Sequence, residues 1–213
     1  SPWRGSTLLP DILPRFEEQY PDVQVVLHEA PVPELGALAE ANVIDFCVMQ
    51  PPGDLTELTY EPVMREHIFL VGHRDHPLLR GLYSTYQDPR PFPDLRLLEH
   101  ERIIMLPADW RLSRLLYNTF SVHSVEPQNI LVTTNTTTAI NLAAEKLGFA
   151  FLQESGIPRT PYLDRLACFT VGEPPLTCPL AVVYKKNGFL SPAARAFIDL
   201  VRDFYSRYDR GTE

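Results

Sequence analysis

STLLPDILPRFEEQYPDVQVVL, residues 6–27, reads as an amphipathic helix that runs directly into a buried strand. Apolar side chains recur at helical spacing, at Leu8, Leu9, Ile12, Leu13, Phe16 and Tyr20. Ser6 and Thr7 are good helix-start residues, and Pro21 stops the helix before the apolar segment 23–27. A helix that leads into a strand is half of a βαβ unit, so this stretch favours an α/β fold.

The hydroxyl pair at the start of this predicted helix has two interpretations. Ser6 and Thr7 could present side-chain and backbone donors to a bound anion, because a helix N-terminus is a common anion site. They could equally only cap the helix. Both interpretations stay open at this stage.

Composition narrows the class of protein. The chain has 213 residues, of which 45% are hydrophobic and 22% charged, as in soluble globular proteins of one large or two small domains. No apolar run reaches the roughly 20 residues that span a bilayer, and no signal region opens the chain. The net charge of -8 argues against nucleic-acid binding by this chain itself. Any DNA contact would have to come from another part of the protein.

The cysteines point to a reducing, cytoplasmic location. Cys47, Cys168 and Cys178 are odd in number and show no C-x-x-C spacing, so we expect neither a disulfide framework nor a zinc site.

Catalytic motifs are also absent from the sequence: there is no G-x-S-x-G, H-E-x-x-H, Walker or G-x-G-x-x-G pattern. The run from His73 to Pro77 reads as a solvated turn rather than a metal cluster. We therefore expect no enzyme and no cofactor.

Helix-like and strand-like segments alternate along the rest of the chain, which favours α/β architecture with mostly parallel sheets. Predicted helices cover residues 34–40, a segment after Asp109 that carries Leu112 to Phe120, a segment after Asn135 that ends at a left-handed Gly148, and a segment that Ser191 caps and Pro192 opens. Predicted strands cover residues 44–49, 67–71, 102–106, 130–133, 149–152 and 180–184, with 58–64 an edge strand or a link and 78–101 a loop with short helical turns. Two crossing strands, near 67–71 and 180–184, would join two α/β lobes.

The binding residues follow from these elements. Helix N-termini at Ser6-Thr7 and at Asn135-Thr136 would face each other across a cleft, and their dipoles favour a small carboxylate. Three consecutive threonines, 136–138, are poor helix formers, which ligand-facing hydroxyls would explain, as would capping and solvent exposure. Further candidates for the cleft wall are Met49, Gln50, Pro107, Trp110 and, where it borders the cleft rather than the core, Phe151.

The chain also resembles a known family, the effector-binding domain of LysR-type transcriptional regulators, whose fold is that of type 2 periplasmic binding proteins. The motifs that carry this resemblance are STLLP with PRFEEQYPDV in residues 6–23, IDFCV at 44–48, HPL at 76–78, LGFAFL at 147–152 and LSPAARAFI at 190–198. Two features depart from the pattern. The segment 81–100 is longer and richer in proline, and Gln153 stands where the family often has proline.

The resemblance implies two Rossmann-like lobes with a ligand cleft between them. Lobe I would comprise residues 1–72 and 180–213, and lobe II residues 73–179. An N-terminal winged helix-turn-helix and the opening strand of lobe I would lie outside this chain. The resemblance further implies a small-molecule co-inducer, homodimers or homotetramers, and contact with promoter DNA and RNA polymerase only through the full-length protein.

We therefore predict the co-inducer-binding domain of a cytoplasmic transcriptional regulator, with no membrane partner. The alternative is a periplasmic-type solute-binding protein that serves a transporter, and an enzyme ranks third. An upstream helix-turn-helix in the gene would favour the regulator, whereas a signal sequence would favour the transporter protein.

Overall fold

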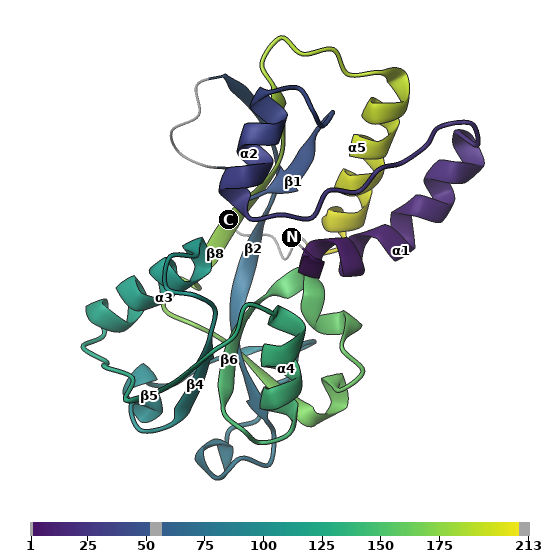
Figure 1. Cartoon of the computed structure of the whole chain (residues 1–213). Coiled ribbons are helices and arrows are strands. Elements are labelled where there is room, and N and C mark those ends of the chain that lie inside the picture. Colours follow the sequence, from purple (N-terminus) through teal and green to yellow (C-terminus); the bar gives the residue numbers. More distant parts are fainter. Residues whose placement is uncertain (1, 52–56, 209–213) are drawn as a thin grey trace. The chain divides into compact units, whose positions relative to one another are not determined.

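A computed structural model describes residues 2–51 and 57–208 of the chain (Figure 1). The chain divides into two compact units: unit 1 holds residues 1–66 and 178–213, and unit 2 holds residues 67–177. Strand β2 (Leu58–His73) carries the chain from unit 1 into unit 2, and β8 (Thr177–Lys185) begins where it returns. Within the described ranges, no helix is long and apolar enough to cross a membrane.

Helices α1 (Pro2–Gln19) and α5 (Pro192–Ser206) pack side by side in unit 1, and α2 (Val32–Glu40) covers another part of its sheet (Figure 1). The predicted apolar stripe of α1 is confirmed, because Leu8, Ile12 and Phe16 are all buried in a core shared with α5 and β8. The rings of Phe16 and Phe197 meet edge to face at 4.9 Å between centroids. Burial of this stripe orients α1 on the unit.

The start of α1 differs from the sequence prediction. The helix begins at Pro2, so Ser6 and Thr7 lie inside its first turns and are not helix-start residues. Each hydroxyl instead donates to a backbone carbonyl three residues earlier: Ser6 Oγ to Trp3 O at 3.0 Å, and Thr7 Oγ1 to Arg4 O at 3.1 Å. Serine and threonine hydroxyls bond locally in this way within helices as well as at caps, which is why the sequence pattern misplaced the helix start.

The predicted strand at residues 23–27 is also wrong. This segment is extended but pairs with no strand in the described part of the structure, and its apolar side chains face solvent. Val26 is 67% exposed and Leu27 53%. A strand requires a neighbour that takes up its backbone hydrogen bonds, and the apolar sequence alone does not supply one.

Among the residues that the structure describes, three strands form the sheet of unit 1. Strand β1 (Cys47–Met49) lies antiparallel to β8, with Cys47 opposite Val183, and the unit 1 part of β2 follows β8 in the order β1-β8-β2. Residues 58–64 are thus a strand rather than a link, and they are continuous with the predicted strand 67–71 in one 16-residue element.

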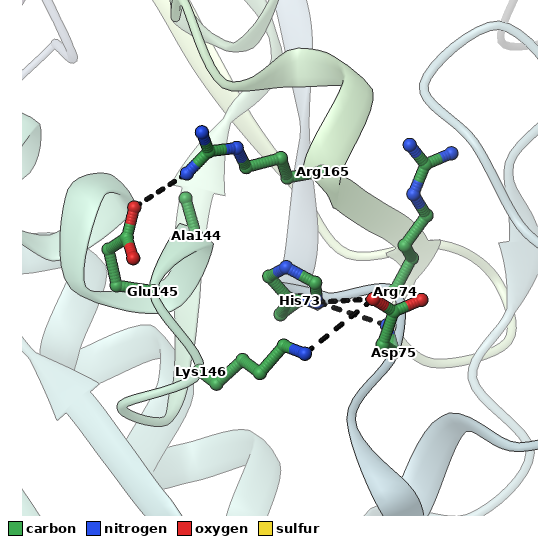
Figure 2. Close-up of a pocket in the computed structure, with 7 residues that line it drawn as sticks. All are labelled: His73, Arg74, Asp75, Ala144, Glu145, Lys146 and Arg165. Atoms are coloured by element: carbon green, nitrogen blue, oxygen red, sulfur yellow. Dashed lines mark hydrogen bonds and ion pairs between the residues drawn. The ribbon is translucent and has the colours of Figure 1, made fainter.

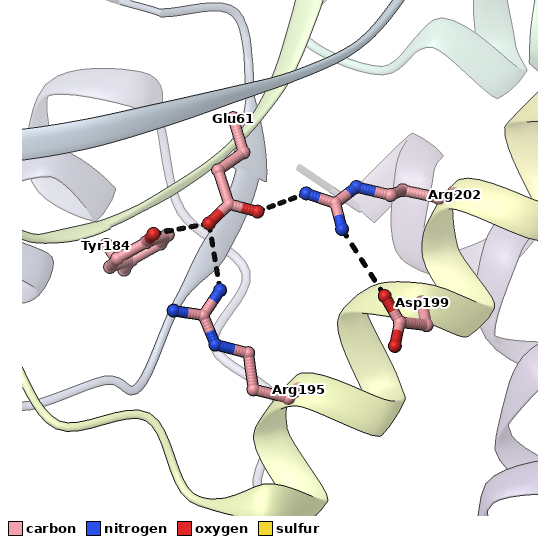
Figure 3. Close-up of polar contacts among 5 residues, drawn as sticks. All are labelled: Glu61, Tyr184, Arg195, Asp199 and Arg202. Atoms are coloured by element: carbon pink, nitrogen blue, oxygen red, sulfur yellow. Dashed lines mark hydrogen bonds and ion pairs between the residues drawn. The ribbon is translucent and has the colours of Figure 1, made fainter.

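A polar network fastens α5 to this sheet (Figure 3). Glu61 on β2 accepts hydrogen bonds from Tyr184 on β8 and from Arg202 on α5, and Arg195 Nη1 donates to its Oε1 at 2.8 Å. Burial works to raise the pKa of Glu61, but these hydrogen bonds and the two arginine charges outweigh it and hold the pKa below its ordinary value. The carboxylate is therefore a charged anchor between sheet and helix.

Unit 2 contains a parallel core of β4 (Arg102–Met105), β5 (Asn129–Val132) and β6 (Phe149–Gln153), in the order β6-β4-β5. Helices α3 (Arg111–Val122) and α4 (Thr136–Ala144) follow β4 and β5. The unit 2 part of β2 lies antiparallel to both β6 and β7 (Leu166–Thr170), a strand that the sequence analysis missed.

The proline-rich segment 81–100 is built onto β7. Strand β3 (Arg90–Pro91) pairs with it in parallel, and the rings of Phe92 and Phe169 meet at 5.4 Å. Short 3-10 turns complete unit 2, η1 (Pro77–Leu79), η2 (Leu95–Leu98), η3 (Glu154–Arg159) and η4 (Leu163–Arg165). The predicted short helical turns in residues 78–101 are confirmed by η1 and η2, but the segment also contains strand β3, which was not predicted.

The cap of α5 agrees with the sequence prediction, whereas the start of α3 and the end of α4 differ from it, as the start of α1 does. Ser191 Oγ accepts from Ala194 N at 3.1 Å, with Pro192 opening α5 as predicted. At the start of α3 the cap position is Trp110 rather than Asp109.

The end of α4 is the second difference. Lys146 (φ 63°), rather than Gly148, is the left-handed residue that directly follows the helix end, and Gly148 also has a positive φ of 145°. A Cβ on Gly148 would lie 2.5 Å from the carbonyl oxygen of Arg102, so that glycine allows β6 to approach β4 closely.

Candidate functional site

Three parallel strands of unit 2 end at the same edge of its sheet. Because β6, β4 and β5 run parallel, the segments that follow them, 154–155, 106–110 and 133–135, leave from that common edge. The backbone N–H of Thr133 donates to Met105 O at 3.0 Å, which holds two of these segments together. Ligands in open α/β sheets bind at the carboxyl ends of the strands, so this edge is the candidate site.

The N-terminus of α4 opens at this edge. Asn135 is its cap, as the sequence predicted: Oδ1 accepts from Thr137 N at 2.8 Å and from Thr138 N at 3.2 Å. Thr136, the first helical residue, is buried, whereas Asn135 is exposed. The cap thus occupies the N–H groups of Thr137 and Thr138 and does not use the N–H and hydroxyl of Thr136.

The segment after β4 forms a tight turn into α3. Trp110 N donates to Pro107 O at 2.9 Å, and Ser113 Oγ donates to Leu106 O at 2.8 Å, so both ends of the turn are fixed. Pro107 and Trp110 are half-buried. The structure therefore brings four of the sequence candidates to one edge of unit 2, Pro107, Trp110, Asn135 and Thr136.

The other candidates lie elsewhere. Phe151 is in the core of unit 2, where its ring meets Phe120 of α3 edge to face at 5.5 Å. Ser6 and Thr7 are in α1 of unit 1, and Thr7 is fully buried. Met49 and Gln50, at the end of β1 in unit 1, are buried as well.

Sequence reasoning missed a buried polar pair at the edge of unit 2. His67 Nδ1 lies 3.1 Å from Glu154 Oε2, and the Glu154 side chain is completely buried. The register of β2 against β6 places Ile68 opposite Gln153, which brings His67 beside the residue that follows β6. The available signal was a carboxylate directly after an apolar parallel strand, the position from which active and binding sites draw their residues.

This edge has the chemistry of a binding site. A helix N-terminus with unused donors favours a negative group. No three His, Cys, Asp or Glu side chains gather as metal ligands anywhere in residues 2–51 and 57–208. The arrangement thus supplies hydrogen-bond donors and dipoles for a small anion.

Comparison with known proteins identifies the family to which this chain belongs. The family model described as the LysR substrate binding domain matches residues 1–206. An uncharacterized HTH-type transcriptional regulator of Shigella flexneri, YfeR, is 24% identical over 196 residues, which cover 92% of this chain and 60% of the relative. The chain therefore spans about three fifths of the length of that relative.

Two solved structures are similar in fold. The BenM effector binding domain with its effector benzoate superposes with a TM-score of 0.74 at 19% identity, covering 97% of this chain and 89% of that one. The CcmR regulatory domain of Synechocystis PCC6803 in complex with 2-PG gives a TM-score of 0.76 at 20% identity, covering 93% and 91%. With a family model that matches nearly its whole length, this chain belongs to the LysR substrate-binding domain family.

Proposed function

We propose that this chain is the effector-sensing domain of a LysR-type transcriptional regulator and that it binds a small carboxylate at the strand-end edge of unit 2. One observation carries the proposal: the capped N-terminus of α4, with Thr136, opens beside the Pro107–Trp110 turn where parallel strands end. Such an end offers N–H groups and a positive dipole to a negative group. The two units would be the two regulatory lobes of the family.

Two structural neighbours of the same fold support the proposal of a small anionic ligand. BenM is described with benzoate, which is a carboxylate, and CcmR with 2-PG. We propose binding without turnover, in line with the effector-bound neighbours of the same fold. We therefore propose a cytoplasmic sensor rather than an enzyme or a transporter-associated binding protein.

DNA contact would belong to another part of the full-length regulator. The chain carries a net charge of -8, and phosphate recognition requires clustered Lys and Arg. Promoter DNA and RNA polymerase would be partners of the whole protein only. Effector binding would reach them through a change in the packing of subunits.

Self-association has a candidate surface on unit 2. Strand β5 is the edge strand of its sheet, and Ile130 and Val132 on it are exposed, as is Val122 on α3. Apolar edge strands pair readily with other chains. We expect sedimentation at about 10 µM to show a dimer for the wild type and a monomer for Val132→Lys, with exposed Val43→Lys in unit 1 as the matched control. A monomeric wild type would contradict this surface.

The ligand proposal is tested by a thermal-shift screen of small carboxylates. A ligand at about 100 times its dissociation constant stabilises by about 2.7 kcal/mol, or about 5–10 °C in Tm for a chain of this size. For the compound found, we expect Thr136→Ala to weaken binding about tenfold in calorimetric titration, because a hydrogen bond to a charged group is lost. Thr138→Ala, whose N–H is held by the Asn135 cap, is the neighbouring control. Equal affinities in all three proteins would refute the site.

A further inference from the structure

A second polar pocket lies at the opposite end of α4 from the site proposed above. It has a volume of about 210 Å³ and is lined by six charged or titratable residues, His73, Arg74, Asp75, Glu145, Lys146 and Arg165 (Figure 2). They come from the end of β2, the C-terminal end of α4 and η4, all within unit 2. In the view of Figure 2, the ring of His73 lies between Arg165 and Lys146.

Positive charge exceeds negative charge in this pocket, although the chain as a whole is acidic. Glu145 Oε1 is paired with Arg165 Nη1 at 2.6 Å, and Asp75 Oδ2 lies 3.6 Å from Lys146 Nζ. Arg74 has no ion-pair partner among the described residues. With His73 neutral, three cations still line the pocket against two carboxylates, and this excess of positive charge favours an anion.

His73 is oriented to donate. Its Nδ1 accepts the backbone N–H of Asp75 at 3.0 Å, so the neutral ring carries its proton on Nε2. The residue is buried, at 9% exposure. Burial and then the charge of Lys146 lower the pKa of His73, with Arg165 and Arg74 adding to the effect and Asp75 opposing it. The positive charges of Lys146, Arg165 and Arg74 thus all disfavour a positive charge on His73. A bound anion would offset this electrostatic repulsion.

We propose that this pocket binds a small dianionic phosphate group, and that it is a site separate from the effector site at the N-terminus of α4. Lys146, Arg165 and Arg74 would supply charge, and Nε2 of His73 a directed hydrogen bond. A second cavity of about 570 Å³ shares Arg74 with this pocket and is walled by residues 82–87 of the proline-rich segment. In a phosphate monoester bound at the pocket, the organic part would extend past Arg74 toward that cavity.

The test is a titration of the isotope-labelled chain by NMR with three probes, sulfate, inorganic phosphate and glycerol phosphate. Sulfate remains a dianion across the working pH range, so its binding reports on the protein groups alone. We expect saturable shifts at His73, Lys146 and Arg165, and a rise in the pKa of His73 when sulfate binds. By linkage, sulfate should then bind more tightly as the pH falls through the pKa of His73.

Charge variants distinguish a specific binding site from non-specific electrostatic attraction of the anion. Lys146→Gln and Arg165→Gln should each weaken sulfate binding about fivefold to tenfold, whereas Lys186→Gln, an exposed lysine in unit 1, should leave it unchanged. Tighter binding of glycerol phosphate than of phosphate would assign the site to a phosphorylated metabolite, and the reverse to free phosphate. The proposal is overturned if no probe gives saturable shifts at His73, or if Lys186→Gln weakens binding as much as Lys146→Gln. Neither result tests carboxylate binding at Thr136, because that binding is followed by the signals of residues 107–110 and 133–138.

Discussion

Glu66→Gln should strongly lower the free energy of unfolding, because it removes the negative charge that pairs with the buried Arg4. Arg4 Nη2 lies 2.5 Å from Glu66 Oε2, and the two side chains are 9% and 0% exposed. Burial alone lowers the pKa of Arg4, but the charge of Glu66 and its hydrogen bond hold the pKa above its ordinary value, so the guanidinium stays charged. Removing one partner of such a pair costs about 3–5 kcal/mol, since the other charge remains buried.

A double variant separates charge burial from packing. Arg4→Met with Glu66→Leu removes both charges and fills the space with apolar atoms, so we expect it to recover at least about half of the loss. The exposed pair of Arg15 and Asp203, at a similar distance of 2.6 Å and with side chains 46% and 51% exposed, is the control. Asp203→Asn should cost less than about 1 kcal/mol.

The assay is urea unfolding followed by circular dichroism, with the free energy of unfolding extrapolated to water. Two results would contradict a strong contribution of the Arg4–Glu66 pair to stability. One is a loss for Glu66→Gln no larger than that for Asp203→Asn. The other is a double variant as unstable as Glu66→Gln alone.

Three further predictions concern a cap, a carboxylate and a thiol. Asn135→Ala should lower the free energy of unfolding by about 1 kcal/mol, measured in urea, because two N–H groups of α4 lose their acceptor. The pKa of Glu61 is lower in the folded chain than its ordinary value of 4.5, so its stabilisation is present above that pH and disappears as the pH falls through the folded value. Urea midpoints from about pH 6 to about pH 3 should therefore fall less steeply for Glu61→Gln than for the wild type. Burial raises the pKa of the Cys47 thiol to about 12, so it should resist a thiol reagent at about pH 8 in the native state and react once urea unfolds the chain.

The helical part of the fold was predictable from the sequence, because apolar spacing and caps act locally. The stripe of α1 and the Ser191 and Asn135 caps follow from residues within a few positions of one another. Strand β2 was not recognised as one element, because the charged residues Arg65 and Glu66 separate the two predicted segments 58–64 and 67–71. In the structure, Arg4 of α1 pairs with the Glu66 carboxylate and allows it to be buried in the strand.

The site was partly predictable for the same physical reason. Asn135 before three threonines is a local signal, and the helix start was placed correctly. Ser6 and Thr7 give a similar local signal, but hydroxyls also bond to carbonyls inside a helix, so composition could not tell the two cases apart. His67 and Glu154 were missed because 87 positions separate them in the sequence, and only the register of β2 against β6 brings them together.

We propose that a small carboxylate binds where the parallel strands of unit 2 end. Amide chemical-shift mapping of the isotope-labelled chain, titrated with the carboxylate that most raises its Tm, would locate the binding site. We predict that the largest shifts fall in residues 107–110 and 133–138, at the turn into α3 and the start of α4. Saturable binding whose shifts leave both segments unchanged would contradict this site.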